Sequence, residues 1–85
     1  MQLLVSPAAL KGLADMPRRE AEALMEKLRQ FAVTPFDPHP WARPLNAPGG
    51  AVRIRQGDRR AICRIDRAAE TVVVDAIAHR REIYR

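Results

Sequence analysis

The stretch AVRIRQGDRRAICRID, residues 51–66, decides the fold of this chain. At its centre is Gly57-Asp58, a dipeptide typical of a two-residue turn between antiparallel strands. The strand-like runs on either side predict a hairpin of residues 51–56 and 59–66. A third apolar run, TVVVDAIA at 71–78, extends this hairpin to a three-stranded antiparallel meander.

Alternation within the first of these strands sorts its side chains onto two faces. Val52 and Ile54 point to one face, and Arg53 and Arg55 point to the other. If helices cover the apolar face, the arginines lie on the uncovered one. The pattern therefore predicts a cationic surface on the solvent side of the sheet.

The first half of the chain predicts a short strand and two helices. QLLV at 2–5 is a strand-like apolar run. Ser6-Pro7 then provides an N-cap followed by proline at the first helical position, so a first helix is expected over 7–15. From Pro17 to Val33 apolar residues recur at spacings of three and four, which predicts a second helix with one apolar stripe.

A proline-rich segment, TPFDPHPWARPLNAPGG at 34–50, separates the helices from the meander. It holds five of the seven prolines, so we expect a connecting loop rather than a strand or a helix. The whole chain, 1–85, is then a single domain of the α+β class. Its expected order is an N-terminal strand, a two-helix hairpin and the meander, in one sheet covered on one face by the helices.

The charge of the chain is carried mainly by arginine. Lys and Arg number 15 against 10 Asp and Glu, and only Lys11 and Lys27 are lysines. Arginine suits bidentate contact with phosphate or carboxylate groups. The second half of the chain holds most of the excess, which favours a polyanionic partner, either nucleic acid or an acidic protein.

Several classes of protein are disfavoured by the sequence. A single cysteine, Cys63, cannot form an internal disulfide, and the N-terminal apolar residues lack a basic leader and are interrupted by Pro7 and Lys11. No run approaches the roughly 20 apolar residues of a membrane span. We expect a cytoplasmic protein that does not contact a membrane.

Metal and cofactor chemistry have no sequence signature here. His39, Cys63 and His79 are far apart and match no zinc-ligand spacing. Cys63 has no evident base partner that would make it a nucleophile, and Gly49-Gly50 precedes a strand rather than a phosphate-binding helix. We therefore predict no metal and no cofactor.

The segment HRREIYR, residues 79–85, follows directly after the last apolar run. One interpretation is a solvated, frayed terminus, in a protein whose arginines are only surface residues. The other is an anion-binding or catalytic cluster in which arginines stabilise a negatively charged phosphorane. In that cluster Tyr84 could stack on a base or transfer a proton.

Three segments in this order, SPAALKGL, VRIRQGDRRAICRID and HRREIYR, resemble the RelE/ParE superfamily of bacterial toxin-antitoxin toxins. The resemblance covers essentially the whole chain, and its terminus is more similar to the RelE branch. It implies a RelE-like fold and a metal-independent endoribonuclease that cuts mRNA on the ribosome and inhibits translation. In that chemistry the 2′-hydroxyl attacks the adjacent phosphate.

The resemblance also implies roles for individual residues. Arg55 matches a basic family position that is often lysine, and Arg60 matches the phosphate-binding arginine. Arg80 matches the arginine that stabilises the phosphorane or the leaving group. Tyr84 matches the tyrosine that closes the C-terminal motif. Arg55 stays protonated and cannot act as a base. We therefore expect His79 or Tyr84 to accept the 2′-hydroxyl proton. The further RNA- or phosphate-binding candidates are Arg53, Arg59 and Arg81.

Partners and alternatives follow from the same resemblance. It implies a cognate antitoxin with an acidic wrapping segment, the ribosome and mRNA as targets, and operator DNA only through the antitoxin complex. A ParE-like inhibitor of DNA gyrase that catalyses nothing is an alternative. A degenerate toxin that retains only antitoxin binding is another, because Arg55 replaces the family lysine.

Overall fold

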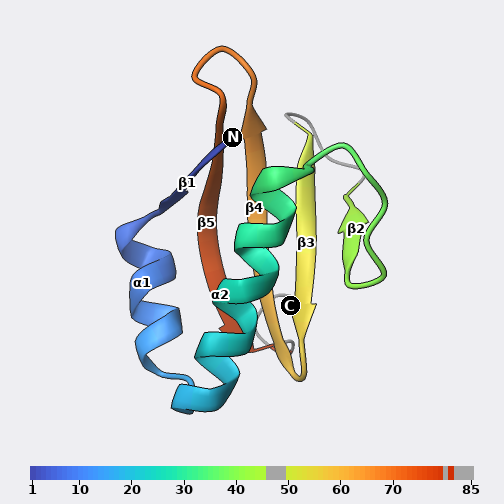
Figure 1. Cartoon of the computed structure of the whole chain (residues 1–85). Helices are drawn as coiled ribbons and strands as arrows, with labels where there is room; N and C mark the ends of the chain where they lie inside the picture. Colours follow the sequence, from blue (N-terminus) through green and yellow to red (C-terminus); the bar gives the residue numbers. More distant parts are fainter. Residues whose placement is uncertain (46–49, 80, 82–85) are drawn as a thin grey trace.

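Two helices lie on one face of a five-stranded sheet in the computed structural model of the chain (Figure 1). The structure describes residues 1–45, 50–79 and 81. The predicted α+β class and the helix-covered sheet are confirmed. The elements in chain order are β1 (Gln2–Val5), α1 (Pro7–Ala14), α2 (Arg18–Val33), β2 (Ala42–Pro44), β3 (Ala51–Gln56), β4 (Arg59–Asp66) and β5 (Thr71–His79).

The sheet has the strand order β1-β5-β4-β3-β2. β3, β4 and β5 form the predicted antiparallel meander, and the Gly57-Asp58 turn joins Gln56 to its register partner Arg59. β1 pairs with β5 in parallel, so two strands that are far apart in the sequence lie side by side. β1 and β2 are the two edges of the sheet.

A short strand lies within residues 34–50, where the sequence analysis predicted only a loop. β2 pairs antiparallel with β3 and places Pro44 opposite Val52. Proline lacks an N–H donor, but an edge strand tolerates it because one side of the strand needs no partner. The prediction was wrong because a high proline content argues against a central strand and not against a short edge strand.

Two local features fix α1 against β5. The Ser6 hydroxyl accepts a hydrogen bond from the Ala9 N–H at 3.1 Å, as expected of an N-cap, and it donates to the main-chain oxygen of Asp75 at 2.9 Å. A β-carbon at Gly12 would lie 1.9 Å from the main-chain oxygen of Ile77. Only glycine therefore allows α1 to approach β5 this closely.

The core lies between the helices and the sheet. The stripe predicted on α2 is buried, with Leu24, Leu28 and Phe31 at its centre, and it packs against Ile54 and Val74 of the sheet. The opposite face of the sheet is free of helices and carries the arginines of β3. Within the described residues, neither helix has the length and apolar content that a membrane crossing needs.

Candidate functional site

Four arginines of three neighbouring strands lie close together on the face of the sheet that the helices leave uncovered. Arg43 of β2 stands opposite Arg53 of β3, and Arg55 of β3 stands opposite Arg60 of β4. Directly opposed residues of antiparallel strands point to the same face, and like charges in such pairs destabilise a sheet. The fold therefore brings two repelling arginine pairs together on three neighbouring strands.

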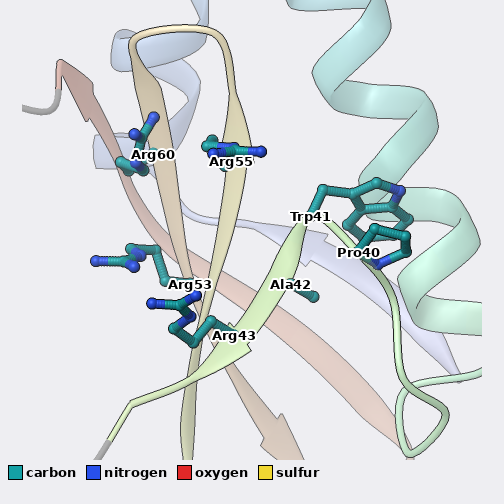
Figure 2. Close-up of a pocket in the computed structure, with 7 residues that line it drawn as sticks. All are labelled: Pro40, Trp41, Ala42, Arg43, Arg53, Arg55 and Arg60. Atoms are coloured by element: carbon teal, nitrogen blue, oxygen red, sulfur yellow. The ribbon is translucent and has the colours of Figure 1, made fainter.

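These four side chains line a pocket of about 240 Å³, which we call the arginine pocket (Figure 2). Its other lining residues are Pro40, Trp41 and Ala42. None of these described lining residues is acidic. A phosphate or carboxylate ligand would offset the repulsion, so the pocket is suited to bind anions.

Arg60 is held in place by its own hairpin. Its side chain is buried, with 8% of the residue exposed. Its Nη1 donates hydrogen bonds to the main-chain oxygens of Gly57 at 2.8 Å and Arg59 at 2.9 Å. Gly57 forms the turn with φ 57°, a conformation that glycine adopts without strain. Arg60 thus stabilises the turn and presents a fixed guanidinium beside Arg55.

The backbone of Arg55 is anchored by the segment before β2. The Arg55 N–H donates to the main-chain oxygen of Trp41 at 2.9 Å. The Trp41 ring stacks on His39 with 4.6 Å between ring centroids, and His39 Nε2 lies 2.9 Å from the main-chain oxygen of Thr34. This stack fixes the wall of the arginine pocket next to β3.

His79 and Arg59 lie on the helix side of the sheet, away from the arginine pocket. β5 runs to His79, one residue beyond the predicted strand, and His79 stands opposite Arg59. Because strand neighbours alternate, Arg59 and Arg60 point to opposite faces. His79 and Arg59 line a second pocket of about 340 Å³, together with Pro17, Glu20, Gly57 and Asp58.

This placement corrects part of the predicted cluster. The sequence analysis grouped His79 and Arg59 with Arg53, Arg55 and Arg60, but the strand register separates the two groups by the thickness of the sheet. His79 Nδ1 instead accepts a hydrogen bond from the main-chain N–H of Arg81 at 3.3 Å. Within the described residues, neither His79 nor Arg59 lines the arginine pocket.

The remaining predicted site residues belong to the segment after β5. Arg81 is exposed. Arg80 and Tyr84 lie outside the described residues. Their roles therefore stay predictions, while the positions of Arg53, Arg55 and Arg60 in one pocket come from the structure.

Arg43 is a site residue that the sequence analysis missed. It lies in the proline-rich segment, and no local pattern there indicates a strand. Its position next to Arg53 follows only from the pairing of β2 with β3. A basic residue shortly before the meander was the single signal available in the sequence.

Cys63 is a core residue and not a nucleophile. Burial raises the pKa of its thiol to about 12, and the Asp75 carboxylate contributes in the same direction. The thiol therefore stays protonated at neutral pH. Within residues 1–45, 50–79 and 81, no three His, Cys, Asp or Glu side chains gather in a way that could hold a metal ion.

The fold and the arginine pocket define a small α+β protein with an anion-attracting sheet face. Residues 3–84 match the family model of the ParE toxin of the type II toxin-antitoxin system parDE, and the chain belongs to this family of toxins. The predicted membership of the RelE/ParE superfamily is thereby confirmed. No curated protein matches the sequence.

Solved structures of the superfamily have the same fold. A chain of the toxin-antitoxin complex RelBE2 from Mycobacterium tuberculosis is 25% identical, with a TM-score of 0.74 and coverage of 92% of this chain and 95% of that chain. A chain of the archaeal RelE-RelB complex from Pyrococcus horikoshii OT3 is 17% identical, with a TM-score of 0.79 and 93% of both chains covered. The YoeB/ParE toxin from Agrobacterium tumefaciens is 17% identical, with a TM-score of 0.75 and coverage of 93% and 98%.

Proposed function

We propose that this toxin is a ribosome-dependent mRNA endoribonuclease that inhibits translation. The observation that carries the proposal is the arginine pocket, in which four arginines converge on the uncovered sheet face. When a 2′-hydroxyl attacks the adjacent phosphate, negative charge grows on the phosphorane in the transition state. Arginines that stay protonated stabilise this charge without a metal ion.

The roles of the pocket residues follow from their positions. Arg60 is fixed by its hairpin bonds, so it is suited to hold the scissile phosphate, with Arg55 opposite it. Arg53 and Arg43 lie two residues further along the strands and are suited to bind a neighbouring phosphate of the RNA backbone. These four roles belong to the proposal.

The resemblance adds residues of the segment after β5 to the proposed site. Arg80 is assigned to the phosphorane or the leaving group, and Arg81 to the RNA backbone. A proton acceptor is also needed, and none of the described lining residues of the arginine pocket can accept a proton at neutral pH. Because His79 faces the other side of the sheet, Tyr84 is the proton-transfer group that we retain.

A cognate antitoxin is the proposed protein partner. The similar structures from Mycobacterium tuberculosis and Pyrococcus horikoshii are complexes of toxin and antitoxin. On the uncovered face of this sheet, Ile62 and Ala78 stand opposite Arg53 and Arg60, so apolar and cationic residues adjoin. An acidic amphipathic segment that folds on binding suits such a surface and would block the pocket. Operator DNA would be bound only through the antitoxin complex.

Induced expression followed by mapping of mRNA 5′ ends tests the proposed activity. We expect codon-linked cleavage of translated mRNA and growth arrest with the parental toxin, and neither with the double variant Arg53→Gln/Arg55→Gln. Arg19→Gln removes an exposed arginine of α2 and serves as the control that keeps activity. Growth arrest with intact mRNA would contradict the proposal.

A gyrase inhibitor of the ParE type is the second candidate. Two observations favour it: the matched family model describes the ParE toxin, and no proton acceptor lines the described part of the arginine pocket. In this case the arginines would be docking contacts and no covalent step would occur. Accumulation of gyrase-linked DNA breaks, with mRNA unchanged, would support this candidate.

A further inference from the structure

Lys27 of α2 supplies a hydrogen bond that the short strand β2 cannot provide. The last register pair of β2 and β3 is Ala42 with Ile54, so β3 continues beyond its edge partner. The next residue, Arg55, satisfies its N–H with Trp41, and its main-chain oxygen accepts a hydrogen bond from Lys27 Nζ at 2.9 Å. α2 thus extends a cation around the open edge of the sheet to the backbone of the arginine pocket.

The charge of Lys27 adds to that of the pocket. Burial lowers the pKa of Lys27, and the Arg55 guanidinium lowers it further, while the Glu20 carboxylate acts in the opposite direction. The Glu20 carboxylate also accepts a hydrogen bond from the Gln56 side chain at 3.0 Å, so it interacts with both Gln56 and Lys27. The cations of the ion pairs among the described residues are Arg18, Arg29 and Arg64, and Lys27 is not one of them. The hydrogen bond to the Arg55 main chain therefore holds the Lys27 ammonium at the edge of the sheet, next to the residue whose side chain lines the arginine pocket.

We propose that Lys27 is a positioning residue and a further cation of the RNA site, next to the four arginines of the arginine pocket. It fixes the end of β3 and so the origin of the Arg55 side chain, and it extends the phosphate-binding surface past the sheet edge. This inference rests on the proposed binding of RNA by the arginine pocket. It assigns to α2 a part of a site whose four pocket arginines lie on the strands.

The salt dependence of RNA binding tests the inference. The probe is a single-stranded RNA of adenosine and cytidine, with fluorescence anisotropy of the purified toxin measured at several salt concentrations. Lys27→Met should weaken binding several-fold and reduce the slope of log Kd against log salt by about 0.7, the value for one lost phosphate contact on a single strand. Lys11→Met is the matched control, because it removes the only other lysine, which lies exposed on α1. It should change neither quantity.

A conservative variant separates charge from folding. Lys27→Arg keeps a cation and a donor, so it should restore both the affinity and the salt slope. As the pH rises toward about 10, lysine loses its charge and arginine does not, so the parental affinity should fall more than that of Lys27→Arg. A role limited to folding would lower the melting temperature without changing the salt slope of the folded protein.

The outcomes also distinguish this inference from the proposed enzymatic activity. Equal effects of Lys27→Met and Lys11→Met would overturn the inference, since they would reflect net charge alone. Failure of the parental toxin to bind the RNA would overturn it as well. If binding responds to Lys27 as expected but ribosome-bound mRNA stays uncut, the inference stands and the catalytic proposal fails.

Discussion

Arg60→Ala should lower both the stability of the toxin and its activity, because Arg60 has two roles. Its Nη1 donates to two main-chain oxygens of the β3–β4 hairpin, at 2.8 and 2.9 Å, and the residue is 8% exposed. A hydrogen bond to a charged group contributes about 1.5–3 kcal/mol. The turn is exposed, so hydrogen bonds to water replace part of this energy in the variant. Removing the repulsion between Arg60 and Arg55 also stabilises the variant by about 0.5 kcal/mol. We expect a net loss of about 2 kcal/mol.

This loss corresponds to a decrease of about 10 °C in the melting temperature of a domain of this size. The measurement is thermal unfolding followed by circular dichroism. Arg55→Ala is the matched control, because Arg55 is exposed and its removal also deletes one arginine of the pocket. It should change stability by less than about 0.5 kcal/mol. Both variants should lose mRNA cleavage, and if they melt at the same temperature, the anchoring of Arg60 by its hairpin is refuted.

Two further predictions concern the core. Gly12→Ala should destabilise the fold by about 2 kcal/mol, because its β-carbon would lie 1.9 Å from the Ile77 oxygen, and this strain exceeds the gain of about 1 kcal/mol in helix propensity. Urea unfolding measures this loss of stability. Ala14→Gly is the control and should lose only about 1 kcal/mol. A Gly12→Ala protein as stable as the parent would contradict the close approach of α1 to β5. Native Cys63 should resist alkylation at about pH 8 and react once the protein is unfolded in urea. Rapid alkylation of the native protein would contradict the burial of the thiol. Because burial raises the pKa of Cys63 from 9.0 to about 12, the contribution of the protonated thiol to stability is complete below pH 9.0 and is lost as the pH rises toward about 12.

The sequence predicted those parts of the fold that depend on local patterns. The Gly57-Asp58 turn and the alternation beside it specify β3 and β4, and the spacing of apolar residues specifies α2. The pairing of β1 with β5 and of β2 with β3 is non-local, and no pattern within either edge strand names its partner. For this reason the strand content of the proline-rich segment was missed.

The same distinction applies to the site. Arg53, Arg55 and Arg60 were predicted correctly to share a surface, because alternation along one hairpin determines their face. Arg43 and Lys27 reach the same region from distant segments, and only the tertiary structure brings them there. His79 was misplaced because β5 continues by one residue, and that residue decides which face the side chain occupies.

The pairing of β1 with β5 links folding to the order of synthesis. Ser6 donates to Asp75, and the backbone that Gly12 approaches belongs to Ile77, so α1 lacks these contacts, and β1 lacks its strand partner, until β5 has been made. Closing a loop of this length carries an entropic cost that local contacts cannot offset early. In a nascent chain the cationic hairpin of β3 and β4 is therefore synthesised before the sheet can be completed by β5 and β1. β5, the last described strand of the chain, is thus the strand on which the first strand and the first helix depend.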